Sequence, residues 1–149
     1  MFNLFKSKYK KLSEYPNDKW SVLTEKEEGL IIRMNDGLRE AVGHPDYPVK
    51  MGVAVPLDKE RGEDILKLKD GIEEKINKFL ESNGVIVSVI NKMKEPKFFE
   101  FLSYTNNGLN FNSLGESLKN GFPGVDIQMY AKLDPKWETY KSFLSRKNN

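Results

Sequence analysis

The sequence contains no cysteine and only one histidine among its 149 residues. The absence of cysteine excludes disulfide bonds, thiolate nucleophiles and zinc sites built on sulfur. A single histidine leaves any metal site dependent on carboxylates for its remaining ligands. We therefore expect no metal site, no cofactor and no complete set of catalytic residues.

Long apolar runs are also missing. No segment approaches the roughly 18 apolar residues that a membrane-spanning helix needs, and the start, "MFNLFKSKYKKL", has lysines where a signal peptide is apolar. We expect a cytoplasmic protein. Its only predicted membrane contact is a weak one through Met1–Leu12, whose apolar side chains lie near one helical face.

Positive charge is scarce outside the first residues. The net charge is +2, yet the first twelve residues hold four lysines and no acid, so the remainder carries about −2. Nucleic-acid binding requires a positive surface that displaces counterions from phosphates. The charge distribution therefore argues against a nucleic-acid partner.

The composition that remains is that of one globular domain, with 38% hydrophobic and 31% charged residues. We expect residues 1–18 to form a basic leader that Pro16 interrupts, residues 19–146 to form a single domain, and residues 147–149 to form a tail. Composition leaves a monomer and a dimer equally open.

Local patterns predict the elements along the chain. Two short apolar runs separated by "EKEEG" predict a β-hairpin over 20–24 and 30–34, with Gly29 in its loop. Asp36 is the predicted N-cap of a short turn that ends at Gly43. Beyond it, period-two alternation or dense apolar runs predict strands, and apolar spacing of three and four predicts helices. The predicted order is a strand at 49–57, a helix at 63–83 closed by Gly84, strands at 85–90 and 97–105, a helix at 110–120, a strand at 125–133, and a closing helix capped by Asp134.

The order strand, helix, strand, strand, helix, strand is that of the ferredoxin-like split βαβ sandwich. We therefore predict an α+β fold with two helices on one face of an antiparallel sheet. The N-terminal hairpin and the C-terminal helix extend it. The opposite face, which carries Gly52 and Ala54, is predicted to be open or covered by a closely approaching element.

The octapeptide "KFFEFLSY" at 97–104 is similar to a strand motif that stacks RNA bases. Exposure of Phe99 and Phe101 would place Glu100 on the helix-covered face, and burying an unpaired carboxylate is costly. The opposite orientation, with both phenylalanines in the core, is therefore favoured. Single-stranded RNA binding through the sheet face is the third hypothesis for function.

The only histidine lies in "GHPDYPVK", residues 43–50. His44 and Asp46 could serve a small-ligand or hydrolytic site together with Arg33, Asp36 and Tyr47. The same stretch is explained as a stiff connector, because a residue that precedes proline is extended and Pro45-Asp46 suits the centre of a tight turn. The connector would fix the directions of His44 and Tyr47.

A series of strings resembles one bacterial family over about residues 18–141. The strings are "RMNDGL", "HPDYP", "VAVPL", "FPGVDIQMY" and "DPKWETY", and the family is catalogued as domain of unknown function 695. Members of that family occur joined to a domain like the regulator of ribonuclease E activity B, a small α/β sandwich that acts by binding the enzyme. The resemblance implies a fold and a regulatory context, and it supplies no reaction, cofactor or functional residue.

We predict a non-catalytic protein-binding or regulatory module, with a protein as its partner. The small-ligand or hydrolytic site around His44 is the alternative. Exposed aromatic and arginine side chains dominate the energetics of interfaces, and an alternative role for Trp137 and Tyr140 is to attach the last helix to the sheet. The predicted partner-binding residues are Arg33, His44, Asp46, Tyr47, Trp137 and Tyr140.

Overall fold

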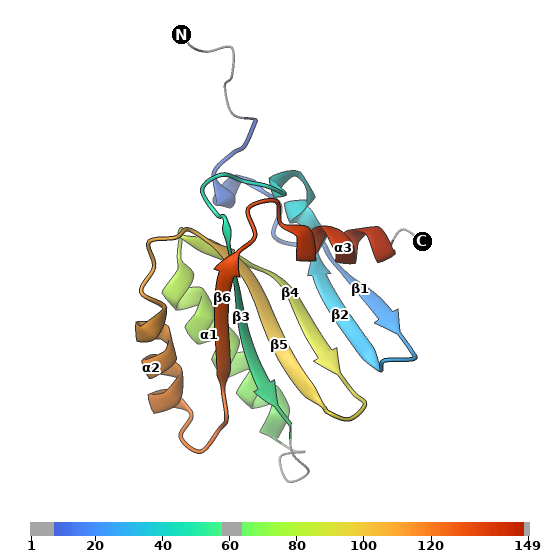
Figure 1. Ribbon diagram of the computed structural model, residues 1–149, viewed down its shortest axis with the longest axis vertical. Helices are drawn as coiled ribbons and strands as arrows, with labels where there is room; N and C mark the ends of the chain where they lie inside the picture. Colours follow the sequence, from blue (N-terminus) through green and yellow to red (C-terminus); the bar gives the residue numbers. More distant parts are fainter. Residues whose placement is uncertain (1–7, 58–63, 148–149) are drawn as a thin grey trace.

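One sheet of six antiparallel strands organises the computed structural model of the protein, which describes residues 8–57 and 64–147 (Figure 1). The strands lie in the order β1-β2-β4-β5-β3-β6, and each pairs antiparallel with its neighbours. The predicted α+β class is confirmed. The strands are β1 (Trp20–Glu25), β2 (Leu30–Asn35), β3 (Val49–Pro56), β4 (Gly84–Lys92), β5 (Phe98–Thr105) and β6 (Gln128–Leu133).

Helices lie on both sides of this sheet. Helices α1 (Ile65–Leu80) and α2 (Phe111–Gly121) cover one face, which we call the α1 face. Helix α3 (Glu138–Lys147) crosses the opposite face, the α3 face, near one end of the strands (Figure 1). Two short 3₁₀ helices, η2 (Leu12–Glu14) and η3 (Asp36–Ala41), lie near the same end. None of the described helices is both long and apolar enough to span a membrane.

Alternation along β3 and β5 builds the core of the α1 face. Val53 pairs with Phe101 and Val55 with Phe99, and all four side chains are buried beneath α1 and α2. The predicted orientation of the two phenylalanines is confirmed, because each is only 1% exposed. Neither ring is therefore available to stack on RNA bases, although the octapeptide that motivated the RNA hypothesis lies on β5 as predicted.

The α3 face is closed at Gly52 by a tyrosine from the neighbouring strand. A Cβ atom on Gly52 would lie 2.1 Å from Cε1 of Tyr130, so the ring packs directly on the glycine backbone. The Tyr130 hydroxyl donates a hydrogen bond of 2.5 Å to the Glu100 carboxylate. Glu100 is thereby paired on the face opposite to the buried phenylalanines, which removes the cost of burying it.

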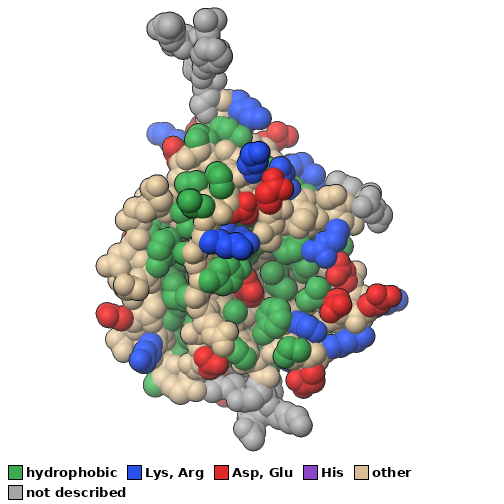
Figure 2. Space-filling view, viewed as in Figure 1, with side chains coloured by type: hydrophobic (Ala, Val, Ile, Leu, Met, Phe, Trp, Pro, Cys, Tyr) green, Lys and Arg blue, Asp and Glu red, His purple; other side chains and the backbone are tan. Residues whose placement is uncertain are grey.

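The visible part of the α3 face carries no large patch of one charge. Lys and Arg side chains alternate there with Asp and Glu around hydrophobic side chains that gather below α3 (Figure 2). A phosphate backbone is bound by clustered cations. This face therefore lacks the charge pattern of a nucleic-acid interface.

Three local predictions require correction. The N-cap of η3 is Asn35, whose side chain accepts a hydrogen bond from the Gly37 amide at 3.0 Å, and not Asp36. Helix α1 ends at Leu80, with Glu81 rather than Gly84 in the left-handed region at φ +49°. Gly84 instead begins β4, where a Cβ would meet the Tyr104 carbonyl oxygen at 2.8 Å.

Trp137 and Tyr140 lie at the centre of the core on the α3 face. Both are 0% exposed. The Trp137 ring stacks on Tyr104 at 4.3 Å between centroids and meets Tyr140 edge-on at 5.9 Å. Of the two roles that the sequence left open, the structure places these side chains in the core and not on an exposed contact surface. Trp137 lies just before α3 and Tyr140 lies in its first turn, and their large rings attach the helix to the sheet.

Each polar atom of this aromatic cluster has a partner. Trp137 Nε1 donates to the Tyr47 carbonyl at 2.9 Å, and the Tyr140 hydroxyl donates to the Asn35 carbonyl at 2.6 Å. The Tyr104 hydroxyl donates to Oδ2 of Asp134 at 2.7 Å. Burial, and then the neighbouring Asp134, raises the pKa of Tyr104. The cluster thus joins α3 to β2, β5 and the segment that precedes β3.

Truncation of Trp137 should be the most damaging single change in this core. We expect Trp137→Ala to lower the free energy of unfolding by about 3–5 kcal/mol, because it opens a large cavity and leaves the Tyr47 carbonyl without its donor. Tyr140→Phe, which keeps the ring, should cost only about 1 kcal/mol. Urea unfolding monitored by circular dichroism measures both values, and an equal loss in the two variants would contradict this assignment.

Asp134 should make stability depend on acid pH. Partial burial opposes its ionisation, but hydrogen bonds from Tyr104 and from the amides of Glu138 and Thr139 hold the pKa of its carboxyl below the ordinary value. A lowered folded-state pKa contributes stability above the unfolded-state pKa, which is lost as pH falls through the folded-state value. Asp134→Asn should therefore cost about 1–3 kcal/mol at neutral pH. Urea titrations at falling pH should show the difference from the parent protein shrinking below about pH 4. A constant difference would contradict the prediction.

Candidate functional site

The connector between η3 and β3, residues 43–48, is a closed turn. The Tyr47 amide donates to the His44 carbonyl at 3.1 Å, which places Pro45 and Asp46 at its centre. Gly43 has φ +81°, a conformation that glycine adopts without strain, where the chain leaves η3. The prediction of a tight turn in this stretch is confirmed.

The His44 ring is fixed by backbone groups at both nitrogens. Nε2 lies 2.8 Å from the Lys10 carbonyl, to which only an Nε2–H tautomer can donate. Nδ1 accepts a hydrogen bond of 3.2 Å from the Asp46 amide. The ring is 4% exposed, with its centroid 4.9 Å from that of Tyr9 and 4.8 Å from that of Tyr47.

This arrangement decides the role of the His44 and Asp46 pair. Asp46 contributes its backbone amide to the ring, whereas a catalytic dyad would use its carboxylate. With both nitrogens engaged, the ring is not free to act as a general base or a metal ligand. His44 instead attaches the segment around Lys10 to the connector.

Tyr47 is held against the end of helix α1. Its hydroxyl donates to the Ser82 carbonyl at 3.1 Å, and its own carbonyl accepts from Trp137 Nε1. Burial, and next the charge of Asp46, raises the pKa of its hydroxyl. Tyr47 therefore remains a neutral donor at physiological pH and links the connector to the α1–β4 junction.

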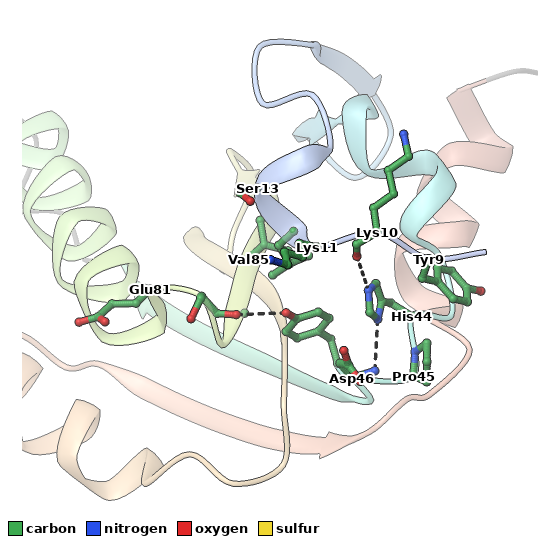
Figure 3. Close-up of a pocket in the computed structure, with 13 residues that line it drawn as sticks. Tyr9, Lys10, Lys11, Ser13, His44, Pro45, Asp46, Glu81 and Val85 are labelled. Carbon is green, nitrogen blue, oxygen red and sulfur yellow. Dashed lines mark hydrogen bonds between the residues drawn. The ribbon is translucent and has the colours of Figure 1, made fainter. Parts of the chain in front are cut away.

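A cavity of about 840 Å³ opens between these attachments (Figure 3). Three segments distant in sequence form its walls: Tyr9–Ser13, His44–Tyr47, and four residues between Glu81 and Val85. A second hollow of about 410 Å³ lies on the other side of Tyr47 and shares Pro45, Asp46, Tyr47 and Ser82 with the first. We call the larger one the connector cavity. Its volume lies within the range of natural ligand sites.

The walls of the connector cavity carry both signs of charge. Lys10 and Lys11 belong to the N-terminal wall, and Asp46 and Glu81 belong to the other two walls. The Lys10 side chain points away from His44, toward the Tyr15 ring, and the Glu81 carboxylate points away from the connector (Figure 3). Glu81 keeps its left-handed backbone at φ +49°, which costs free energy for a residue with a side chain. A ligand that fits here would present groups of both charges along its length.

Other residues that we predicted for the site lie elsewhere. Arg33 is exposed on β2, where its guanidinium lies 5.1 Å above the Trp20 ring. Neither Arg33 nor Asp36 lines the connector cavity. Only His44, Asp46 and Tyr47, of the six predicted binding residues, come together there. Among the described residues, no cluster of three or more histidine, aspartate or glutamate side chains could hold a metal ion.

Sequence reasoning missed two of the three walls. Tyr9–Ser13 was assigned to the basic leader, and residues 81–85 were interpreted only as the end of a helix and the start of the next strand. The only local signal was the string "YKKL" at 9–12, in which a tyrosine and a leucine flank two lysines. The contact between Lys10 and His44 spans 34 positions, so no local pattern could have revealed it.

The fold and cavity together define a small α+β protein with a six-stranded antiparallel sheet and a hollow of mixed polar and apolar lining at one end. The chain belongs to a family of unknown function, DUF695, whose model matches residues 18–145. The resemblance found in the sequence strings is thereby confirmed. No curated protein and no solved structure matches the chain.

Removal of the His44 ring should loosen the N-terminal wall. We expect His44→Ala to cost about 2–4 kcal/mol, because it deletes a buried ring and two hydrogen bonds. The amides of Glu14 and Tyr15 donate to the carbonyls of Lys11 and Leu12. In His44→Ala these two amides should exchange with solvent faster than in the parent protein, whereas the exchange rates of the α1 amides should stay unchanged. Hydrogen exchange followed by NMR tests this. His44→Gln, which retains a donor and an acceptor, is the control, and uniform acceleration across the domain in His44→Ala would contradict a local attachment.

Proposed function

We propose that this protein is a non-catalytic binding module that takes a segment of another protein into the connector cavity. The observation that carries the proposal is the use of both His44 ring nitrogens in holding a cavity wall. A histidine that is engaged in this way stabilises the shape of the cavity, which suits a binding site better than a catalytic one. The setting that we propose, cytoplasmic and regulatory, rests on the resemblance to a family joined to a ribonuclease regulator.

The chemistry of the walls favours a polypeptide occupant. Residues of both charges, Lys11 and Asp46 among them, line the hollow together with the aromatic residues Tyr9 and Tyr47. A peptide presents both charges and apolar groups over a short length, whereas a nucleic acid presents mainly negative charge. Aromatic side chains at the centre of a recess are favoured anchors of interfaces.

We also propose that residues 49–133 are a ferredoxin-like split βαβ core. Strands β4, β5, β3 and β6 follow one another in the sheet in that order, with α1 and α2 on the same face. Two crossover units, β3-α1-β4 and β5-α2-β6, produce this strand order when both are right-handed and place their helices on the same face. The observed order therefore supports the proposal. The hairpin β1–β2 then extends the sheet beside β4.

The proposal can be tested with peptides selected from a random phage-displayed library on the intact chain. We expect the selected peptides to bind about tenfold more weakly to the double variant Asp46→Lys with Glu81→Lys. The matched control is Glu74→Lys with Asp126→Lys, which makes the same charge change at exposed positions outside the cavity. Equal binding to both variants, or no selection of peptides at all, would overturn the proposal.

A further inference from the structure

The β1–β2 hairpin extends the α1 face beyond the helices that cover it. In the sheet register, Val22 lies opposite Arg33, and Arg33 lies opposite Val89 of the core. Thr24, Ile31 and Asn91 form the next row. Figure 1 shows α1 behind β3 and β6 and α2 to the left of β6, and no described helix lies behind β1 and β2. The two outer strands therefore leave this face uncovered.

The uncovered area carries exposed apolar side chains. Val22 is 58% exposed and Ile31 is 38% exposed, on neighbouring strands and on the same face. Single exposed apolar residues are ordinary, but here they adjoin a half-buried tryptophan and a helix edge. We call this area the hairpin shoulder. Its residues are Trp20, Val22, Thr24, Ile31, Arg33 and Lys69.

Two cations lie at the inner border of the shoulder. Arg33 stacks on Trp20, and Lys69 of α1 donates to the Asn91 side chain at 2.6 Å, with Nζ also 5.7 Å from the Phe99 ring centroid. Burial, and next the charge of Arg33, lowers the pKa of Lys69, while Asp70 and Glu73 act in the opposite direction. Among the described residues, neither cation forms a salt bridge, although Lys141 and Arg146 do.

We infer that the hairpin shoulder is a second interaction surface, which binds an acidic and aliphatic segment of a partner protein. A carboxylate placed between Arg33 and Lys69 relieves the repulsion of two neighbouring cations. Arginine offers that carboxylate a paired set of donors. Aliphatic side chains of the same segment then cover Val22 and Ile31.

Charge and shape together select a protein occupant over a nucleic acid. Two cations release few counterions, and tight phosphate binding needs many. Bases stack on exposed aromatic rings, but the Trp20 ring already carries Arg33 on one side. An apolar patch bordered by an arginine and a tryptophan is instead the composition of a protein interface hot spot.

The test uses three short synthetic peptides that share one aliphatic sequence and differ only in carrying Glu, Gln or Lys at alternate positions. Each is titrated into isotope-labelled intact protein and followed by NMR. We expect the Glu peptide to shift the Trp20 indole and the amides of Val22, Ile31 and Arg33. The indole of Trp137, which is 0% exposed, is an internal control and should not move.

Charge variants locate the effect. Arg33→Gln and Lys69→Gln should each weaken binding of the Glu peptide by about fivefold or more, and Arg39→Gln, an exposed arginine on η3, should leave it unchanged. Tighter binding of the Lys peptide, an unchanged affinity in Arg33→Gln, or stronger shifts of the same residues with oligothymidine would each overturn the inference. The cavity variants Asp46→Lys and Glu81→Lys should not affect this titration, so its result is independent of the proposed function.

Discussion

The stack of Trp137 on Tyr104 holds the core of the α3 face together. It is fully buried, with ring planes only 6° apart, and it fixes α3 against β5. Large aromatic surfaces supply much of the apolar burial that a small domain can achieve. Trp137 holds a left-handed backbone at φ +56°, so this packing also offsets a local strain.

The same stack determines where the connector lies. Trp137 Nε1 fixes the Tyr47 carbonyl, and the Tyr47 hydroxyl reaches Ser82. His44 then attaches the N-terminal segment at Lys10. The connector cavity exists because three segments meet at these attachments without filling the space between them. Its walls therefore depend on an aromatic core that no ligand touches.

Much of the fold was predictable because its signals are local. Alternation along β3 and the apolar spacing of α1 depend on neighbouring residues, and burial followed both. The role of Trp137 was harder to predict from the sequence, because an aromatic residue near the start of a helix can equally be a core residue or an exposed interface residue. The direction of Arg33 depended on β2 lying beside β4, a pairing across more than fifty positions that no local pattern encodes.

The N-terminal segment connects the two surfaces that we propose. Residues 9–13 form a wall of the connector cavity, and Tyr15 is buried in the core of the α3 face. The chain then passes Asn17, whose carbonyl accepts a hydrogen bond from Trp20 Nε1 in the shoulder. Since Gly37 leaves no room for a side chain beside the Pro16 carbonyl, this path is closely packed. The segment that separates the two surfaces is therefore itself packed against the fold, and each surface uses side chains of its own.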